Sequence, residues 1–524
     1  MRVTSDVVWS IALFPVVLSV KIHGDLLEIA QSTGHIDAFV QFQPFNFESK
    51  TMARVNSLLE SRLPVMTAYA GWQEFAGESE MQLTADQLAR GIRRQTVMEI
   101  LLKHAEKTQG PTLHELQKLG YNAKSFWIDN SILIKQAPLY LLTMLVQLAQ
   151  SEEGKDIISL SPNRVVARIP PMSRMTVGGL YHGRSLFETI DLSENYIPWH
   201  LRLIKADKVW KHSKGKGVTV ANIDTGVDFI HPRLKGKYRG IDSELKTVKH
   251  EYNWFDPEGL AVLPYDCHGH GTHTMGTMVG DGIGVAPEAK WIASQGCDSE
   301  GCSQERLLAS AQWVMCPTDL NGENARCELG ADIVNNSWGG EITDDASMTW
   351  FSSAVKAWLA GGVFPIFAQG NSGPACGTVG TPGDLEDVIG VGAVDQFGSL
   401  AVFSSRGPGG SRLGHAQFKP DYVAPGQAIV SCKPGGELVA MSGTSMAAPH
   451  VAGVAALLLS MKGDLKFDEL RALITKTINT SALKEPQMGQ QACYGKRWDH
   501  FPNYHYGFGL VDAEAAAKYL LKEE

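Results

Sequence analysis

The chain has 524 residues, of which 44% are hydrophobic and 20% are charged, a composition typical of globular proteins with sizeable cores. A net charge of −9 gives no electrostatic support for a nucleic-acid partner. No apolar run reaches the roughly 20 residues that a membrane-spanning helix needs, so we expect no membrane span.

The first 34 residues are a candidate signal peptide and leader. Residues 7–20 are mostly apolar and follow Arg2, which suits the hydrophobic region of a signal peptide. Asp6 in the preceding stretch and the lack of an Ala-x-Ala cleavage site favour the alternative, a buried or unprocessed segment.

Residues 35–168 are predicted to form a small α+β domain with the order β–α–β–α–β. "HIDAFVQF" alternates like a strand, and "GIRRQTVMEILLKHAEKT" has helical periodicity. Gly110-Pro111 should end that helix, and "TLHELQKLGY" should begin another. The stretch "SFWIDNSILIKQ" predicts one strand, "PLYLLTMLVQLAQ" a helix and "IISLSPNRVVARI" a final pair of strands.

Residues 169–196 have the composition of a linker. They contain Pro170-Pro171 and Gly178-Gly179 and few periodic runs. Because proteolytic cutting concentrates in exposed linkers, we expect maturation cleavage here.

Residues 197–524 are predicted to form an α/β domain with a doubly wound, mostly parallel sheet flanked by helices. Short β-rich runs alternate with helical runs in this region. The strand-like runs are "GVTVANID", "WIASQG", "ADIVNNSWG", "GVFPIFAQGN", "VIGVGAVD" and "QFKPDYVAPG", and the helical runs are His273–Val279, Gln304–Met315, Met348–Leu359 and Ser445–Met461. Such sheets place their ligand sites at the carboxyl ends of the strands.

The stretch "DCHGHGTHTMG" contains three histidines and a cysteine, which are ordinary zinc ligands, so it predicts either a zinc site or a catalytic base among helpers. Two more residues could take part in catalysis. Asp224 closes a predicted strand, and Ser445 begins a predicted helix, where the helix dipole stabilises negative charge. Singly, Asp224 could cap a turn, His270 could be a core histidine and Ser445 could be a helix N-cap.

Taken together, these segments resemble the subtilisin-like serine proteases. "VANIDTGVDFIHP", "GHGTHTMGT" and "GTSMAAPHVAG" match that family's Asp, His and Ser segments in its order, and "FAQGN" matches its oxyanion segment. The resemblance covers about residues 197–520. It implies a secreted serine endopeptidase that hydrolyses polypeptides and is made as a zymogen. The segment before residue 169 resembles the family's inhibitory propeptide more loosely, with a longer insertion near residues 46–90.

The resemblance also assigns roles. His270 would take the Ser445 hydroxyl proton, Asp224 would orient His270, and Ser445 would attack the scissile carbonyl and form an acyl-enzyme. The Asn371 side-chain amide and the Ser445 backbone N–H would form the oxyanion hole. A zinc hydrolase built on the histidine cluster and a catalytically dead binding or inhibitory protein are the competing functions.

Two backbone edges are expected to bind substrate. "NNSWGG" matches the family's substrate-binding strand, so the substrate should add a strand beside Ser337, Trp338 and Gly339. The opposite edge would come from Ser299, Glu300 and Gly301. Five acidic residues lie close to these edges in the sequence: Asp298, Glu300, Glu341, Asp344 and Asp345. Acidic residues are more often part of a solvated surface than determinants of substrate specificity. A preference for basic substrates is the alternative.

No metal or cofactor is expected to be required. Many family members bind calcium through an Asp placed where this chain has Arg233, and the loop after the histidine helix is shortened to "VGDGIGV". Because calcium needs six to eight oxygen ligands, we expect that site to be absent, while a weak calcium site elsewhere stays open. The expected partners are polypeptide substrates and the chain's own propeptide, which would act as an intramolecular inhibitor and chaperone. The protein is expected to be a monomer.

All eight cysteines follow residue 260, and an even number in one region favours disulfides in a secreted protein. Scattered buried thiols in a reduced intracellular protein are the alternative. Cys316 and Cys327 could close a loop locally. Resemblance to the proteinase K-like branch implies a Cys267–Cys297 pair, with Cys297–Cys302 as the competing local pair. The other cysteines stay unassigned.

Overall fold

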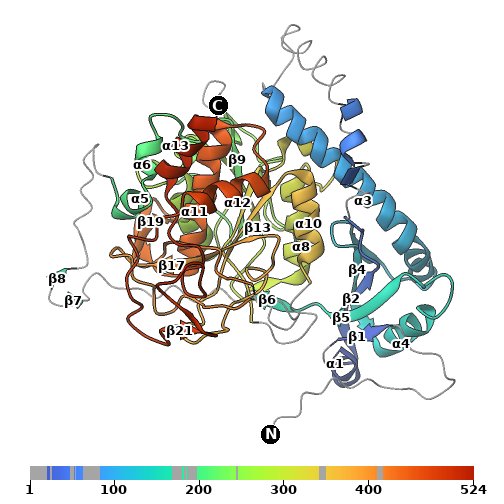
Figure 1. Ribbon diagram of the computed structural model, residues 1–524. Coiled ribbons are helices and arrows are strands. Elements are labelled where there is room, and N and C mark those ends of the chain that lie inside the picture. The colour runs from blue at the N-terminus through green and yellow to red at the C-terminus, as the bar shows by residue number, and fades with distance from the viewer. Residues whose placement is uncertain are drawn as a thin grey trace. The chain divides into compact units, whose positions relative to one another are not determined.

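A computed structural model describes residues 20–23, 26–47, 52–53, 55–58, 60–62, 83–167, 180–181, 184–185, 197–242, 246–341, 350–409 and 417–523 (Figure 1). The chain divides into two compact units, one made of Met1–Thr51 and Val97–Arg164 and the other of Met52–Thr96 and Val165–Glu524. Residues 1–19 of the candidate signal peptide and most of the candidate linker lie outside the described residues.

The smaller unit is built on a five-stranded mixed sheet with the order β1-β5-β2-β4-β3. Its strands are Lys21–Ile22 (β1), His35–Phe42 (β2), Ala123–Phe126 (β3), Ser131–Pro138 (β4) and Ile157–Pro162 (β5). Helices Leu26–Thr33 (α1) and Leu139–Leu148 (α4) contribute to its apolar core. The strand predicted at residues 35–42 and the helix predicted after residue 137 are confirmed.

The helix predicted to end at Gly110-Pro111 is continuous instead, and α3 runs from Ala85 to Lys118 with Pro111 inside it. Contacts on both sides of the proline hold the helix. The Gln109 side chain donates to Asn130 Oδ1 at 2.8 Å, and Leu116 is buried in the core. Tertiary packing thus outweighs the local cost of a helical proline.

Two strand predictions in this region were also wrong. The stretch expected to be one strand is a hairpin of β3 and β4, turned at Asn130, whose φ of 58° lies in the left-handed region. The final strand pair is not a pair either. β5 joins the smaller sheet, whereas Val165–Ala167 (β6) pairs antiparallel with Cys302–Ser303 (β14) in the larger unit.

The larger unit contains a seven-stranded parallel sheet with the order β12-β13-β9-β15-β16-β17-β18. The strands are Thr219–Asp224 (β9), Trp254–Phe255 (β12), Lys290–Gln295 (β13), Ile333–Asn336 (β15), Phe364–Ala368 (β16), Ile389–Val394 (β17) and Tyr422–Pro425 (β18). Six of them match the predicted strand-like runs. The predicted doubly wound parallel sheet is therefore confirmed.

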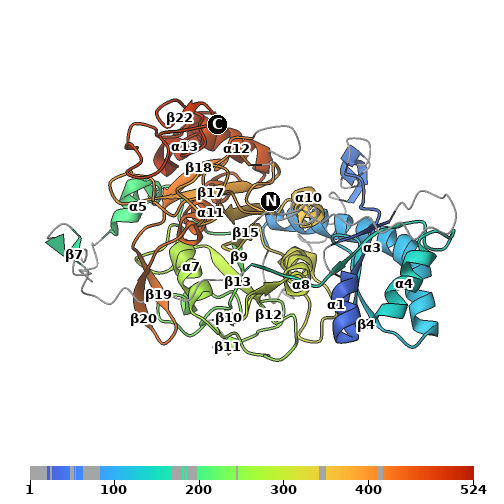
Figure 2. The ribbon, with the colours of Figure 1, turned by 90° about the horizontal axis from the view of Figure 1, so that it is seen from below.

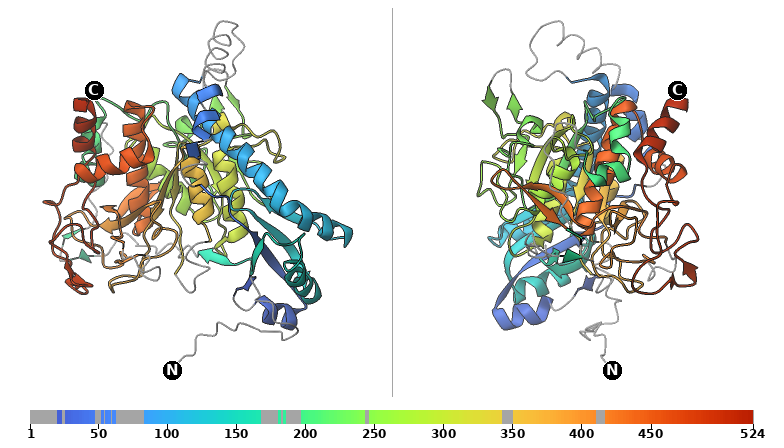
Figure 3. Two further views of the ribbon diagram at one scale, coloured as in Figure 1. Left: turned by 45° about the vertical axis from the view of Figure 1, so that its right-hand side comes forward. Right: turned by 90° about the vertical axis from the view of Figure 1, so that its left-hand side faces the viewer.

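Helices cover both faces of this sheet (Figures 2 and 3). Because side chains alternate along a strand, Asn222 and Asp224 of β9 face α7, while Ile223 points toward α8. The four predicted helical runs correspond to helices whose observed bounds are His270–Val279 (α7), Gln304–Met315 (α8), Ser352–Gly361 (α10) and Thr444–Met461 (α11). Among the described residues only α11 is long and apolar enough to cross a membrane, and it forms part of the buried core.

Shorter elements complete the larger unit. They are Leu180–Tyr181 (β7), Arg184–Ser185 (β8), Trp199–Leu203 (α5), Ala206–Val209 (α6), Lys235–Lys237 (η1), Ile241–Asp242 (β10), Thr247–Val248 (β11), Cys327–Leu329 (η2), Ile429–Lys433 (β19), Glu437–Met441 (β20), Phe467–Lys476 (α12), Ala492–Cys493 (β21), Lys496–Arg497 (β22) and Ala513–Glu523 (α13).

The disulfides correct one predicted pairing. Cys297 pairs with Cys302, so Cys267 is free, and the implied Cys267–Cys297 bond was wrong. The reason is local, because a short turn over residues 298–301 brings the two partners together. The Cys316–Cys327 pair is confirmed. Sequence spacing gave no sign of the long-range Cys376–Cys493 bond, and Cys432 is free and buried.

Candidate active site

Asp224 and His270 form a hydrogen-bonded pair at the carboxyl edge of the seven-stranded sheet. Asp224 ends β9, and His270 begins α7. His270 Nδ1 lies 2.8 Å from Asp224 Oδ1, and both side chains are buried. Burial alone lowers the pKa of His270, but the Asp224 charge and hydrogen bond outweigh it and raise the pKa above the ordinary 6.5. Since Nδ1 is engaged by the carboxylate, Nε2 is the nitrogen that can accept a proton.

Asp266 holds the start of α7 in place. Its carboxylate accepts hydrogen bonds from the backbone N–H groups of His268, Gly269 and Thr272, and from the Thr225 hydroxyl. Sequence reasoning gave Asp266 no role. Its position just before a helix start was the available signal, because short acidic side chains cap helix N-termini.

The glycine after His270 permits the helix to approach β9. A Cβ added at Gly271 would lie 2.1 Å from the Gly226 carbonyl oxygen and 3.1 Å from the Asp224 Cβ. Any larger residue would push the helix start away from the strand. Gly271 is therefore required for the short His270–Asp224 distance.

Ser445 lies in the first turn of α11, at the same edge of the sheet. Its hydroxyl donates to the Ser337 carbonyl oxygen at 3.0 Å, and the Ser337 hydroxyl donates to the Ser445 carbonyl oxygen at 2.8 Å. No hydrogen bond between Ser445 Oγ and His270 Nε2 is present among the described residues. In structures without substrate, catalytic hydrogen bonds are often long or poorly aligned, and they tighten when substrate is bound.

Asn371 is oriented by the residue before Ser445. Its side-chain oxygen accepts hydrogen bonds from the Thr444 backbone N–H at 2.9 Å and from the Thr444 hydroxyl at 3.0 Å. The Asn371 side-chain nitrogen therefore points away from Thr444, and it comes within 3.5 Å of an ideal Cβ on Gly443. The amide N–H groups stay available beside Ser445, on an exposed side chain.

A buried chain of hydrogen bonds runs beneath these groups. The Asn222 side-chain nitrogen donates to the Thr274 hydroxyl at 2.8 Å, and Thr274 contacts Asp224 Oδ2 at 3.4 Å. The Asn222 side-chain oxygen accepts from Asn335 at 3.0 Å, and Asn335 also donates to the Ser337 hydroxyl at 2.9 Å. This path links the Asp224 side to the Ser445 side. Sequence reasoning missed it, because two asparagines far apart in the chain carry no local signal.

The predicted substrate edges lie on either side of β6. Ser299 and Glu300 are exposed in a turn, closed by hydrogen bonds from the Glu300 and Gly301 N–H groups to Asp298. The next residues, β14, are the ones that pair with β6. On the other side, a Cβ at Gly340 would lie 2.2 Å from the Val166 carbonyl oxygen.

The residues on the predicted inner strand contribute mainly backbone. Ser337 is engaged with Ser445, as described above. The Trp338 side chain is buried and packs edge-on against Phe351 and Phe367. Trp338 and Gly339 therefore leave their main chain, rather than a large side chain, to line this edge, and Gly339 lies next to the Thr381 carbonyl oxygen.

Part of the predicted acidic character is neutralised. Arg306 forms ion pairs with Glu258 at 2.7 Å and with Asp298 at 3.3 Å. Asp298 also serves the turn described above, so its charge is not freely available to substrate. Asp344 and Asp345 lie outside the described residues.

The other two histidines of the cluster face different surroundings. His273 Nε2 lies 2.9 Å from the Ile429 carbonyl oxygen, and burial lowers the pKa of His273 to about 3. Burial and the neighbouring His270 lower the pKa of His268. In the described part of the chain, no group of three or more His, Cys, Asp or Glu side chains is placed to hold a metal ion.

Arg233 connects the two segments in which the resemblance led us to expect that the usual calcium site is absent. Its guanidinium donates to the Asp281 carbonyl oxygen at 2.5 Å, and its own carbonyl oxygen accepts from the Asp281 N–H at 3.0 Å. The cationic side chain thus ties the shortened loop to the segment after β9.

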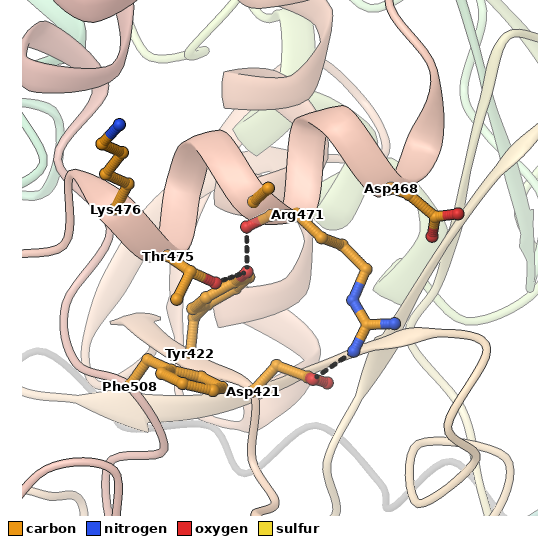
Figure 4. A pocket seen from close by; sticks show the side chains of 8 residues that line it. Asp421, Tyr422, Asp468, Arg471, Thr475, Lys476 and Phe508 are labelled. Atoms are coloured by element: carbon orange, nitrogen blue, oxygen red, sulfur yellow. Dashed lines mark hydrogen bonds and ion pairs between the residues drawn. The ribbon is translucent and has the colours of Figure 1, made fainter.

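A pocket of about 500 Å³ lies away from these residues, between β18 and α12 (Figure 4). Four of its charged and polar side chains bond one another in pairs. Arg471 pairs with Asp421 at 3.2 Å, and the Tyr422 hydroxyl bonds Thr475. None of the predicted site residues lines it.

Comparisons with known proteins point to one family. Residues 215–509 match the family model described as Subtilase family. The chain is 39% identical over 332 residues to bacillopeptidase F of Bacillus subtilis (strain 168), covering 60% of this chain and 22% of that protein. It is 32% identical to serine protease AprX of the same strain, covering 57% of this chain and 66% of AprX. It is 31% identical to subtilisin DY of Bacillus licheniformis, covering 62% of this chain and 99% of that protein. The matched region thus spans about a fifth of bacillopeptidase F and nearly all of subtilisin DY.

Proposed function

The chain belongs to the subtilase family of subtilisin-like serine proteases, and from that premise we propose that it is an endopeptidase that hydrolyses polypeptides through an acyl-enzyme. The observation that carries the proposal is the 2.8 Å contact between His270 Nδ1 and Asp224, beside Ser445 at a helix start. In this mechanism the Ser445 hydroxyl turns from Ser337 toward His270 Nε2, which takes its proton as Ser445 attacks the carbonyl.

The oxyanion that forms is stabilised by Asn371 and by the Ser445 backbone N–H. Thr444 supports this role, because it occupies the Asn371 oxygen and leaves the amide hydrogens for the substrate. The N-terminal end of α11 adds its positive dipole end at the same place. His270 then returns its proton to the leaving amine, and water completes hydrolysis by the same steps.

The chain is further proposed to be a zymogen whose residues 35–168 act as an inhibitory propeptide. Support comes from β6, whose extended backbone pairs with β14 on one side and lies against Gly340 on the other. β14 and Gly340 directly follow the two segments expected to bind a substrate strand, residues 299–301 and 337–339. The segment would therefore keep substrate out until the chain is cut within residues 169–196.

Secretion is proposed from the three disulfides, which persist in oxidising compartments. The names of the relatives do not decide this point, because one of them is the intracellular serine protease of Paenibacillus polymyxa. No metal or cofactor is proposed for catalysis, and the protein is proposed to act as a monomer.

Active-site labelling tests the catalytic proposal. In protein that has been cut within residues 169–196 and freed of its N-terminal part, a fluorophosphonate should label Ser445 and abolish peptidase activity, whereas zinc chelators should leave the activity unchanged. Loss of activity with chelator and no labelling would favour a zinc hydrolase, and folded protein with neither activity nor labelling would favour an inactive binding protein.

The zymogen proposal has its own test. Ser445→Ala should accumulate at full unprocessed length, because cleavage would depend on the enzyme itself. Normal processing of this variant as a purified protein would exclude self-cleavage.

A further inference from the structure

Residues 85–96, the first part of α3, carry three arginines that reach into the larger unit. Arg90, Arg93 and Arg94 are spaced i, i+3 and i+4, so their side chains leave the helix on one face. In the chain they lie between the two segments of the smaller unit, yet they belong to the same compact unit as the seven-stranded sheet. Their contacts are therefore contacts within the larger unit.

Two of these arginines converge on one buried carboxylate. Arg94 Nη2 lies 2.5 Å and Arg90 Nε 2.8 Å from Asp332 Oδ1. The Arg94 side chain is 1% exposed and the Asp332 side chain is 4% exposed. The second oxygen, Asp332 Oδ2, accepts from the Thr219 backbone N–H at 2.9 Å. Asp332 thus sits in a closed site filled by guanidinium groups.

The remaining donors bind backbone carbonyl oxygens near the ends of other elements. Arg94 Nη1 donates to the Gly330 oxygen at 2.9 Å, Arg90 Nη1 to the Gly463 oxygen at 2.9 Å, and Arg93 Nε to the Ala360 oxygen at 2.8 Å. The last two carbonyls lie at the carboxyl ends of α11 and α10, where the helix dipole favours cations.

The backbone of α3 also lies close to the backbone of the segment that contains Glu328. A Cβ added at Gly91 would lie 2.5 Å from the Glu328 Cα, so the helix can seat only with glycine at this position. Gly91 and the three arginines together make residues 85–96 complementary in shape and charge to the surface around Asp332 and Glu328.

This surface lies at the opposite edge of the sheet from the candidate active site. Thr219, which bonds Asp332, begins β9, and Asp224 ends it, so the two edges are separated by about 17 Å of strand at ~3.3 Å per residue. β6 lies at the catalytic edge. Segments from before and after residues 97–164 therefore contact the larger unit near both ends of its parallel strands.

We propose that residues 85–96 are a second anchor of the propeptide, an arginine-bearing helix whose binding site is the Asp332 pocket, and that this anchor keeps the N-terminal part bound after the chain is cut. The inference rests on the proposed function only for the cut within residues 169–196. Release of β6 from the catalytic edge then does not free the N-terminal part, because the arginine anchor must also be withdrawn.

The chemistry of the pocket explains why this anchor holds. A guanidinium is a planar fork that can donate to a carboxylate and to nearby carbonyl oxygens at once, which a lysine ammonium cannot reproduce. Withdrawing the helix would break both ion pairs with Asp332 together with the hydrogen bonds from Arg90 and Arg94 to the Gly463 and Gly330 carbonyl oxygens, and it would open the site to water. Because these bonds must break before water can replace them, release is slow.

The test uses the full chain with Ser445→Ala and a recognition site for an unrelated endopeptidase inserted within residues 169–196. After complete cutting, the rate at which the N-terminal fragment leaves is followed by size-exclusion chromatography or by fluorescence anisotropy of a dye on the fragment. The parent fragment should stay bound, and Arg90→Leu/Arg94→Leu should release it about 100-fold faster, because the buried pair is lost. Arg90→Lys/Arg94→Lys should fall between them.

A matched control is Lys103→Leu, which removes an exposed cation from the same helix and should leave the release rate unchanged. Thermal melting of the uncut variants establishes that each one folds. Equal release rates for the parent and Arg90→Leu/Arg94→Leu would overturn the anchor, as would release of the parent fragment at once.

Failure of the proposed function gives a different result. In that case the cut fragment of the Ser445→Ala protein still stays bound through the arginines, but protein with Ser445 intact does not react with a fluorophosphonate even after it has been cut and its N-terminal fragment removed.

Discussion

The Asn335 side-chain nitrogen donates to the Asn222 side-chain oxygen at 3.0 Å, in the fully buried layer beneath the candidate active site. Both groups are on neighbouring parallel strands, β9 and β15, whose register sets Asn222 beside Asn335. Through Thr274 and Ser337 the pair touches both sides of the site. Buried amides of this kind are stabilising only while every partner is present.

Replacing Asn222 by Leu should therefore impair turnover more than substrate binding. The change removes the acceptor of one Asn335 amide hydrogen bond and one of the two side-chain donors to the Gly271 carbonyl oxygen, at a cost of about 1–3 kcal/mol in the free energy of unfolding. We expect kcat to fall about tenfold with KM little changed. Steady-state kinetics and urea unfolding measure both quantities, with Asn321→Ala in an exposed loop as the control. An unchanged kcat would mean that the asparagine pair does not position the site.

The activity should depend on pH through His270. The base must be neutral, and its pKa is raised above 6.5, so activity should fall as the pH drops through that raised value. Asp224→Asn removes the charge that raises the pKa and should move the acid limb to lower pH. It should also reduce kcat about 10,000-fold, as for the same substitution in other serine proteases. A pH profile of kcat/KM for both proteins decides this, and an acid limb that did not move would exclude Asp224 as the partner of the base.

Replacing Asn371 by Leu should lower kcat without unfolding the protein. In a subtilisin the loss of this kind of donor costs about 100- to 1000-fold in kcat, and we expect the same range here. KM should change little, because the bond forms to the oxyanion rather than to the substrate carbonyl. Thr444→Val removes one of the two groups that orient Asn371 and should give a smaller loss. A full rate in Asn371→Leu would place the oxyanion elsewhere.

Acid should destabilise the protein through a buried histidine pair. His200 Nδ1 lies 2.8 Å from His450 Nε2, and the Met446 carbonyl accepts from His450 Nδ1, so both rings are neutral. Burial lowers the pKa of His450 from 6.5 to about 4 and that of His200 well below 6.5. The unfolded chain then binds more protons below pH 6.5, and stability present above that pH is lost as the pH falls toward 4, by about 3 kcal/mol for His450.

The check for this pair is urea unfolding at pH 7 and at pH 4.5, in the Ser445→Ala background to prevent self-digestion. His200→Phe/His450→Leu should show a smaller loss of stability between the two pH values than the parent. An equal loss would assign the acid sensitivity to other groups.

Chelator should not lower the melting temperature, whereas loss of Arg233 should. Arg233 takes the position of an expected calcium ligand and binds the Asp281 carbonyl oxygen. Arg233→Ala removes this charged hydrogen bond, which is worth about 1.5–3 kcal/mol. Differential scanning calorimetry with and without EDTA measures both effects, with Lys235→Ala as a nearby exposed control. A fall of many degrees in the wild-type protein with EDTA would reveal a calcium site.

The sequence motifs were sufficient to predict the parallel sheet and to single out Asp224, His270, Ser445 and Asn371, because each stands in a short segment with its own pattern. The structure places all four at one edge of the sheet. It does not test their roles, which stay predictions until the variants are measured.

What the sequence could not predict depended on contacts between distant residues. Pro111 predicted a helix break that the packing of Leu116 and the Gln109–Asn130 bond overcame. Cys267 was assigned by resemblance, whereas a turn of a few residues selected Cys302 as the partner of Cys297. The ion pairs of Arg90 and Arg94 with Asp332 join residues more than two hundred positions apart, for which local spacing carries no information.

The free thiol of Cys267 can be labelled selectively. Six of the eight cysteines are paired and Cys432 is buried, which leaves Cys267 as the accessible thiol, three residues from His270. Burial and nearby acids raise the pKa of Cys267, so a maleimide dye would need mildly alkaline conditions to react. A dye at this single position would report directly on events at the candidate active site, without an engineered cysteine and with every disulfide intact.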